Sequence, residues 1–518
     1  MSRSLEDIRS VRLIVGLEIH VELATRSKMF SRAPNPACTE HENAEPNTLT
    51  DATVLALPGS LPVMNLGAVE MAMRVGLALG CRVAGVSKWD RKNYFYPDMP
   101  KAYQISQYDL PLCFDGAVDV PAVDEQGLPD PEGPAARIGI IRAHLEEDAG
   151  KLLHESPGGL PIDHSIVDLN RAGTPLLEIV TQPDFRTADQ VVAFARQLRQ
   201  TCRALGVTLG VMQKGHMRFE PNINVALMLS DGREVRTPVV EVKNLNSFRS
   251  LRGAIEHELK EQPGRWVSDG LEMGPGRKTT RGWDDERQAT YVQRHKEDAE
   301  DYRYFPDPDL PLVAPDQAWV ERLRDALPEL PSAKYARFIR EFDLTRKEAA
   351  TLVEEPELTR LYESSIGAMA GIEYARAGRV AANLLLQAGL KRANERQMSI
   401  TELAIDATAV GAIGMLRESG RVSAAAADEL FGAFCDGGPG RSVEEEAGSR
   451  GLLIVRDDAA LERWCDEVIA GNSRAAEDVR TGKVQAVGRL VGEVMKKAGG
   501  AADAKTVRET LLRKLGQG

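Results

Sequence analysis

Hydrophobic and polar residues alternate along several stretches of the first 300 residues, each bounded by glycine, proline or aspartate. Alternation with a period of two is typical of a β-strand with one buried face, whereas apolar residues spaced three and four apart indicate a helix. Two stretches, residues 69–80 and 189–206, have the helical spacing. We therefore predict an α+β domain with a mixed, mostly antiparallel sheet. The expected strands are residues 12–23, 137–145, 165–183, 217–229 and 237–248.

The pattern becomes entirely helical from about residue 317 onward, where Ala, Leu, Glu and Arg dominate. A glycine-rich, charged stretch at residues 435–451 predicts a loop. Beyond it, Val484, Val487, Val491 and Val494 form one apolar stripe of a further helix. The expected division is a sheet-containing domain (1–310), an all-helical domain (311–424) and a small helical tail domain (425–518).

Composition narrows the class of protein. A chain of 518 residues exceeds the size of one hydrophobic core, which fits several domains. The net charge of -12 argues against a surface that coats nucleic acid throughout, so any RNA contact should be a local patch. The six cysteines include no CxxC pair, which excludes a finger or ribbon zinc site. The charged N-terminus and the lack of a long apolar run predict a cytoplasmic protein with no membrane segment.

Acidic residues cluster on two of the expected strands. In GLEIHVEL, alternation places Glu18, His20 and Glu22 on one strand face. In RAHLEEDAGK, a continuing strand would direct Glu146 to one face and Glu147 to the other, but a turn at DAG would break the alternation. The spacing therefore leaves open which glutamate points inward. Clustered oxygen ligands favour Mg²⁺ over zinc, and a solvated charged strand end is the alternative interpretation.

Aromatic residues are concentrated in WDRKNYFYPDMPKAYQISQY, residues 89–108. Six of these 20 residues are aromatic in a chain that is 5% aromatic. Interleaved with Arg91, Lys92 and Lys101, they are suited to stack on a base and to hold phosphates, although an aromatic core is also consistent with them. The prolines at positions 97 and 100 favour a shaped loop over a regular strand.

Polar residues also lie inside otherwise apolar runs, which is costly unless each has a partner or a function. Such residues recur in several segments and together favour a polar cavity. They are Asp168, Asn170, Arg171, Glu178, Arg218, Glu220, Asn222, Glu241, Lys243, Asn244 and Asn246. The chain has no P-loop, no dinucleotide fingerprint and no kinase motif. The basic, glycine-containing fragment GPGRKTTR is weak evidence of phosphate binding and is more often a turn.

These segments, in this order, closely resemble the B-subunit family of the aspartyl/glutamyl-tRNA(Asn/Gln) amidotransferases. The resemblance covers essentially the whole chain and rests on VGLEIHVEL, AEPNT, LPGSLPVMN, DRKNYFYPDMPKAYQISQYDLPL, HLEEDAGK, VDLNRAGTPLLEIVTQPD, MRFEPNIN, EVKNLNSF, DYRYFPDPDLP and GKVQAVGRLVGEVMKKAGG. The related archaeal E subunit, which has an inserted domain, fits less well because DYRYFPDPDLP runs directly into the helical region.

The resemblance implies an ATP-dependent carbon–nitrogen ligase that works in a heterotrimer with an amidase (the A subunit) and a small protein (the C subunit). The B subunit would phosphorylate the side-chain carboxylate of Glu-tRNA(Gln) or Asp-tRNA(Asn). Ammonia that the amidase releases from glutamine would then displace phosphate. A non-catalytic scaffold that presents the tRNA 3′ end is the alternative function. The three predicted domains would correspond to a cradle domain with the ATP and Mg²⁺ site, a helical domain and a tRNA-binding tail.

The resemblance also suggests residue roles. It assigns Mg²⁺ to Glu18, His20, Glu147 and Glu241. Lys92, Arg171 and Lys243 are candidates for contacts with phosphate or carboxylate in the reaction. Glu147 is also a candidate catalytic residue, which would act through the metal. Candidates for nucleotide or tRNA-end binding are Tyr94, Tyr96, Lys101, Tyr103, Asn170 and Asn244.

One segment departs from the family pattern. Many members carry paired cysteines around AEPNT that bind a structural zinc, whereas this chain has Ser31, Ala33, Asp51 and Val54 where cysteines would be expected. Cys38 alone cannot make such a site. We therefore expect no zinc.

Overall fold

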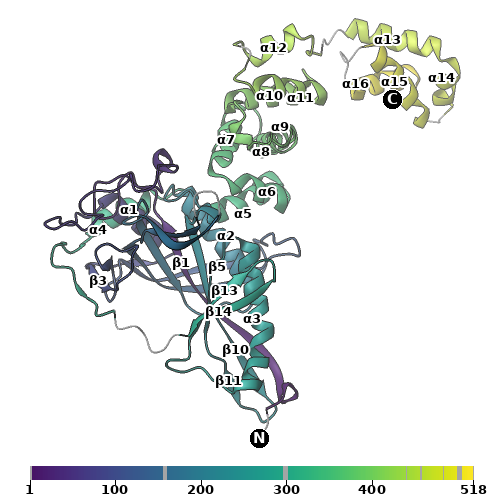
Figure 1. Ribbon diagram of the computed structural model, residues 1–518. Helices are drawn as coiled ribbons and strands as arrows, with labels where there is room; N and C mark the ends of the chain where they lie inside the picture. The colour runs from purple at the N-terminus through teal and green to yellow at the C-terminus, as the bar shows by residue number, and fades with distance from the viewer. Residues whose placement is uncertain are drawn as a thin grey trace. The chain divides into compact units, whose positions relative to one another are not determined.

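The computed structural model describes residues 3–155, 160–295, 302–438, 440–454, 458–481, 484–498 and 504–516. The chain forms two compact units, Met1–Lys334 and Tyr335–Gly518. The expected sheet-containing region followed by a helical region is confirmed (Figure 1). The three-domain division stays a prediction.

A ten-stranded sheet dominates the first unit, in the order β14-β13-β12-β10-β1-β9-β6-β5-β2, with β11 paired to β10. All of its pairings are antiparallel except β12 with β13, so the predicted mixed, mostly antiparallel sheet is confirmed. Its strands are β1 (Ile8–Glu22), β2 (Arg82–Val83), β5 (Cys113–Pro121), β6 (Ala135–Glu147), β9 (Pro175–Thr181), β10 (Met217–Leu229), β11 (Glu234–Arg236), β12 (Val240–Lys243), β13 (Thr279–Asp284) and β14 (Ala289–His295).

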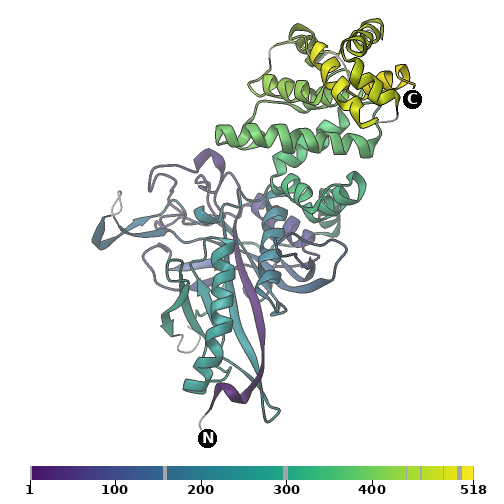
Figure 2. The same cartoon turned by 90° about the vertical axis from the view of Figure 1, so that its right-hand side faces the viewer.

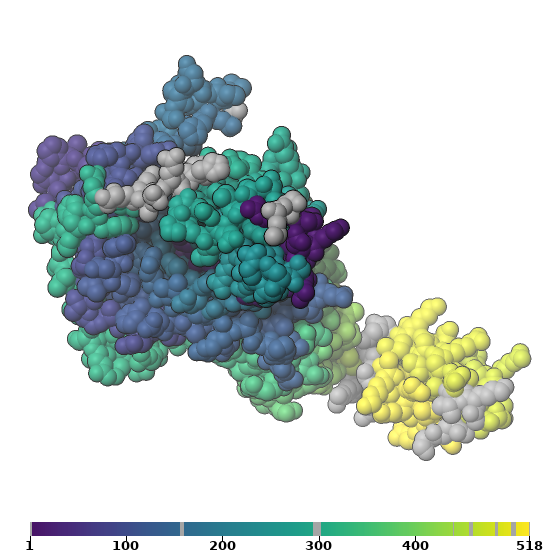
Figure 3. Space-filling model, turned by 90° about the horizontal axis from the view of Figure 1, so that it is seen from below, coloured from purple at the N-terminus to yellow at the C-terminus, as the bar shows by residue number. Residues whose placement is uncertain are grey.

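Two smaller sheets accompany the large one. The aromatic stretch forms β3 (Asp90–Asn93) and β4 (Tyr103–Ser106), which pair with each other, while β15 (Phe305–Pro306) pairs with β3. The two prolines lie in the connection between β3 and β4, so the predicted loop is flanked by short strands. Strands β7 (Lys151–Glu155) and β8 (Pro161–Asp168) form a hairpin that projects from this unit (Figures 2 and 3, blue).

Helices cover one face of the large sheet: α1 (Leu66–Ala78), α2 (Ala188–Ala204) and α3 (Phe248–Asp269). Helix α4 (Gln317–Asp325) packs against α1. Apolar side chains of β1, including Leu17 and Ile19, share one core with Phe194 of α2 and Ile255 of α3. Side chains on a strand alternate between faces, so the polar residues of β1 are directed to the opposite face. The fold thus separates an apolar face from a polar one.

The second unit is helical, and its apolar side chains form two clusters. The first cluster centres on Phe338, Tyr362 and Phe431. The second, near the C-terminus, includes Val487 and Val494 of the predicted valine stripe. The helices are α5 (Pro331–Phe342), which begins at the boundary, α6 (Arg346–Glu354), α7 (Pro356–Gly367), α8 (Tyr374–Asn383), α9 (Leu390–Arg396), α10 (Ala407–Glu418), α11 (Ala424–Phe434), α12 (Val443–Ser449), α13 (Asp458–Gly471), α14 (Ser473–Arg480), α15 (Val487–Lys497) and α16 (Ala504–Lys514).

No helix within the described ranges combines the length and the apolar character that crossing a membrane requires.

Candidate metal centre

The polar face of the large sheet is built by strand register. His20 of β1 lies opposite Arg218 of β10 on one side and opposite Glu178 of β9 on the other. Glu178 in turn lies opposite His144 of β6. Residues paired across neighbouring strands project from the same sheet face. Four strands that are distant in sequence therefore bring their polar side chains together.

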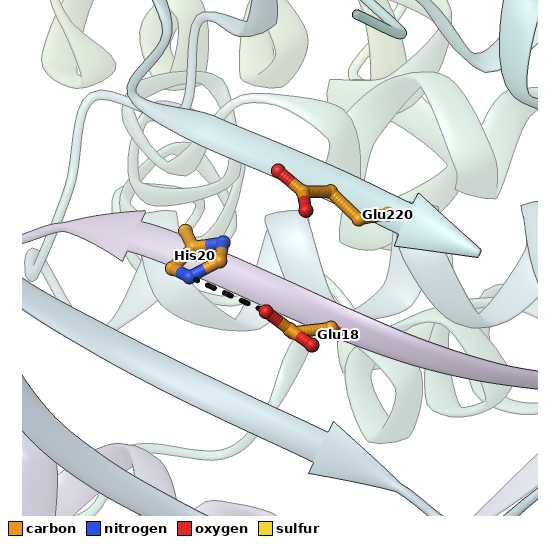
Figure 4. Close-up of side chains that lie close together, drawn as sticks. All are labelled: Glu18, His20 and Glu220. Atoms are coloured by element: carbon orange, nitrogen blue, oxygen red, sulfur yellow. Dashed lines mark ion pairs between the residues drawn. The ribbon is translucent and has the colours of Figure 1, made fainter. Parts of the chain in front are cut away.

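His20 lies at the centre of this group. Its Nε2 atom is 3.9 Å from Glu18 Oε1, 3.7 Å from Glu146 Oε1 and 3.5 Å from Glu178 Oε2. Figure 4 shows Glu18 and His20 of β1 together with Glu220 of the neighbouring strand. Ligand atoms lie within 4.8 Å of one another in two sets, Glu18–His20–Glu220 and His20–Glu146–Glu178. Because oxygen ligands lie about 2.0–2.6 Å from Mg²⁺ or Ca²⁺, either set is compact enough for one cation.

Several buried polar atoms on this face have no hydrogen-bond partner among the described residues. They include His20 Nδ1, His144 Nδ1 and Asn222 Oδ1. A buried polar atom without a partner is rare because it loses its hydration without compensation. Their position beside the carboxylates supports a ligand site over a purely structural network.

The carboxylates hold a proton on His20. Burial lowers its pKa, but the hydrogen bond and charge of Glu178, with further carboxylates, outweigh burial and raise that pKa to about 9. Burial, with the charge of Glu178, raises the pKa of Glu146 to about 7. For Glu178, burial is outweighed by the two histidines and Arg142, and its pKa falls below the usual range. A metal ion would take the place of the His20 proton, since only neutral imidazole is a ligand.

Lysines border the carboxylates. Lys243 Nζ donates to Glu220 Oε2 at 2.7 Å. The Lys92 ammonium lies 5.0 Å from the ring centre of Tyr302. Burial lowers the pKa of Lys92, but Glu146 and other neighbours outweigh it and leave the pKa raised. The site thus combines cation ligands with positive groups, an arrangement suited to a metal-bound polyanion.

The sequence of this chain is similar to two family models and to several named proteins. Residues 13–321 match the GatB/GatE catalytic domain, and residues 371–515 match the GatB domain. Proteins named as the B subunit of aspartyl/glutamyl-tRNA(Asn/Gln) amidotransferase are similar over nearly their full length. The protein from Thermobifida fusca is 44% identical over 521 residues, covering 99% of this chain and 95% of the relative. The protein from Variovorax paradoxus is 41% identical over 512 residues, covering 98% of this chain and 100% of the relative. The protein from Rhodopirellula baltica is 39% identical over 503 residues, covering 97% of this chain and 96% of the relative.

The chain belongs to the B-subunit family of the aspartyl/glutamyl-tRNA(Asn/Gln) amidotransferases.

Among the residues that the family resemblance assigned to Mg²⁺, the structure brings Glu18 and His20 together. Glu147 projects to the other side of β6, where its Oε1 atom pairs with Lys101 and accepts from the Ile105 backbone N–H at 3.0 Å. Glu146 is therefore the glutamate that faces His20, as a continuing strand would direct it. The turn at DAG begins only after Glu147, the last residue of β6, so it does not break the alternation.

Glu241 lies at the edge of the group. It opposes Asn222 across β10 and β12, and its charge helps to raise the pKa of Glu18, which burial and Glu178 raise more strongly. Glu146, Glu178 and Glu220 are the three acidic members that the predicted metal set did not contain. Their signal was present as polar positions in apolar strands, but only the strand register shows that they converge.

Two of the other predicted residues support loops. Arg171 donates to the carbonyls of Ala149 and Gly150 at 2.9 and 2.8 Å. Asn170 accepts from the Leu49 N–H at 2.8 Å and donates to the Glu45 carbonyl at 2.7 Å. Through these hydrogen bonds, Arg171 and Asn170 stabilise the turns beside the candidate metal centre.

The aromatic candidates lie at different positions. Tyr94 is half-buried against Tyr302, with ring centres 6.5 Å apart. Tyr103 lies under the Arg91 guanidinium at 4.4 Å, whereas Tyr96 is 59% exposed. Asn244 is exposed, with a left-handed backbone (φ 65°) just after β12.

The four positions where the resemblance led us to expect zinc-binding cysteines contain no sulfur. Ala33 and Val54 pack with Ala172 in a small apolar cluster. Asp51 Oδ1 accepts from the N–H groups of Thr53 and Val54 at 3.0 and 2.9 Å, and Ser31 Oγ accepts from the Ala33 N–H at 3.2 Å. Buried Lys28 donates to the carbonyls of Leu169 and Ala172 beside them. These side chains offer one carboxylate and no thiolate, so they do not fit a structural zinc.

A second acidic pair lies next to the candidate metal centre. Asp148 accepts from Arg218 Nη2 at 2.6 Å, and buried Glu22 lies beside it. Burial raises the pKa of Glu22 to about 8, and the charge of Asp148 adds to this, while Arg218 and Arg171 oppose it. Glu22 is therefore protonated at neutral pH in the folded protein.

Replacing Glu22 by glutamine should stabilise the protein at alkaline pH. The folded state holds the Glu22 proton more tightly than the unfolded chain, so stability from this proton is complete below about pH 4.5 and is lost as pH rises toward 8. Because glutamine cannot ionise, Glu22→Gln should raise the melting temperature by about 2–4 °C at pH 8.5, with a smaller gain at pH 5.5. Thermal unfolding at both pH values, with exposed Glu132→Gln as control, tests this. A gain that is equal at both pH values would contradict the assignment.

Proposed function

We propose that this chain is the ATP-dependent, carboxylate-activating subunit of a glutamine-dependent tRNA amidotransferase, a heterotrimer that also contains an amidase and a small third protein. It would phosphorylate the side chain of Glu-tRNA(Gln) or Asp-tRNA(Asn), and ammonia would then displace the phosphate to give Gln-tRNA(Gln) or Asn-tRNA(Asn). The observation that carries the proposal is the His20-centred carboxylate group with its bordering lysines. A cytoplasmic location would suit a reaction on aminoacyl-tRNA.

The chemistry requires like charges to meet, because a carboxylate must approach a triphosphate. Mg²⁺, when bound, would offset this repulsion and stabilise charge on the transferring phosphoryl group. His20, Glu146 and Glu178 would hold it, with Glu18 and Glu220 as the neighbouring set. Lys92 and Lys243 would orient the phosphates and the substrate carboxylate by their charge.

The tyrosines beside this site would hold flat groups of the substrates. The rings of Tyr94 and Tyr302 pack edge to face, and Tyr108 stacks on Tyr304 with ring centres 4.0 Å apart. Aromatic faces bind bases and adenosine with little regard to sequence, as the shared tRNA 3′ end requires. The C-terminal helices would bind the body of the tRNA.

A non-catalytic scaffold is less well supported. A surface that only presents RNA would gain from positive charge, whereas this face contains buried carboxylates that repel phosphate unless a cation intervenes. The acidic group therefore favours catalysis over simple binding.

Metal binding should distinguish Glu146 from Glu147. In the heterotrimer, Glu146→Gln should weaken Mn²⁺ binding at least about 10-fold, because it removes an oxygen ligand. It should also abolish formation of the phosphorylated aminoacyl-tRNA while tRNA still binds. Glu147→Gln, the matched control on the opposite strand face, should leave Mn²⁺ affinity unchanged. Electron paramagnetic resonance of free Mn²⁺ measures both affinities.

The reverse result, with Mn²⁺ binding lost in Glu147→Gln and retained in Glu146→Gln, would support the ligand set that the family resemblance implies. Intact phosphorylation in Glu146→Gln would contradict the proposed role of the centre.

We further propose that the loop around Ser31 and Val54 needs no zinc, because apolar packing and the Lys28 contacts hold it together. Purified, chelator-washed protein should keep its melting temperature and contain far less than one zinc per chain. Elemental analysis measures the content, and about one equivalent of tightly held zinc would overturn the proposal.

A further inference from the structure

Lys278 lies beside the candidate metal centre, although it belongs to none of the segments that define it. It is the fifth residue of GPGRKTTR and directly precedes β13. Strand β13 runs parallel to β12, and Thr280 is opposite Glu241. This register places Lys278 Nζ 3.3 Å from Glu241 Oε1 and Thr280 Oγ1 2.9 Å from Glu241 Oε2. This loop, whose sequence is typical of a turn, therefore brings an ammonium group to the edge of the carboxylates.

The contact repeats a pattern found elsewhere on this face. Lys243 pairs with Glu220 as Lys278 pairs with Glu241, and each lysine is about one-third exposed. Thr280 also holds the Glu241 carboxylate, so this acid does not depend on Lys278 alone for hydrogen bonding. The lysine can leave without stranding the carboxylate. A buried charge that loses its only partner would instead be strongly destabilised.

The charges around the two lysine–glutamate pairs favour different partners for the lysines with and without a divalent cation. With no divalent ion present, the lysines offset the clustered carboxylates. A divalent cation on the same carboxylates supplies positive charge there, and the lysines then gain more from a phosphate, which carries negative charge and several acceptor oxygens. The partly exposed Lys278 lies on a glycine-containing turn, with Gly276 at φ +68°, and has room to change partner.

We propose that Lys278 is a further phosphate-binding residue, which exchanges Glu241 for a phosphate oxygen of the nucleotide when a divalent cation occupies the carboxylates. The inference rests on the proposed function and deepens it. Lys278 would then be a nucleotide-binding residue that lies outside the segments from which the site was predicted. Without nucleotide, the positive charge of Lys278 at the edge of the carboxylates would also oppose binding of the metal.

The two roles predict opposite effects of one substitution. In the full heterotrimer, Lys278→Met should tighten Mn²⁺ binding without nucleotide by about 2-fold or more, since the competing ammonium is gone. The same substitution should weaken ATP binding in the presence of Mn²⁺ by about 10-fold, the loss expected for one charge-assisted hydrogen bond. Lys278→Arg should restore much of the ATP affinity. Exposed Lys260→Met on α3 is the matched control and should change neither.

Equilibrium binding of Mn²⁺ and of ATP, with no turnover, measures both effects. Unchanged ATP affinity in Lys278→Met would overturn the inference, and so would a parallel loss of ATP and Mn²⁺ affinity, which indicates a structural role. If the unsubstituted heterotrimer itself fails to bind ATP with Mn²⁺, the proposed function fails. Normal binding by that heterotrimer with no effect of Lys278→Met refutes only the role of Lys278.

Discussion

The contact between His20 and Glu178, across the pairing of β1 with β9, determines what the rest of the site can be. Its 3.5 Å separation follows from the register in which His20 opposes Glu178. A shift of β1 by one residue would turn His20 and Glu18 into the apolar core and expose Leu17 and Ile19. The buried apolar face therefore fixes the orientation of the polar one. The helices that cover the core contribute indirectly, by holding the register.

The polar face destabilises the fold, because its carboxylates repel one another and several of them are buried. Neighbouring groups reduce this repulsion. Five glutamates (Glu18, Glu146, Glu178, Glu220, Glu241) lie near one imidazole, several of them buried. Protonation of His20, partial protonation of Glu146 and the bordering lysines reduce the repulsion. A divalent cation bound to these carboxylates would offset the same repulsion. The buried His20 Nδ1 and His144 Nδ1 atoms have no hydrogen-bond partner among the described residues, which is why we interpret the face as a site and not only as a stabilising network.

Much of the fold could be predicted because its signals are local. Alternation identified β1, β6 and β10, and helical spacing identified α1 and α2. Helix α3 was not predicted, since Pro263 and the neighbouring glycine interrupt its pattern. The site was predicted only in part. Which strands are neighbours depends on long-range pairing, so Glu178 and Glu220 could be seen as unusual polar residues but not as companions of His20. Alternation depends only on local sequence, and it correctly directs the Glu146 side chain to the face that carries His20.

The assignment of the metal to His20, Glu146 and Glu178 can be tested by anomalous X-ray scattering from a crystal of the heterotrimer grown with Mn²⁺. We expect a peak within about 2.3 Å of His20 Nε2, with Glu146 and Glu178 oxygens in the same coordination sphere. A peak bound by Glu147 and distant from Glu146 would contradict it.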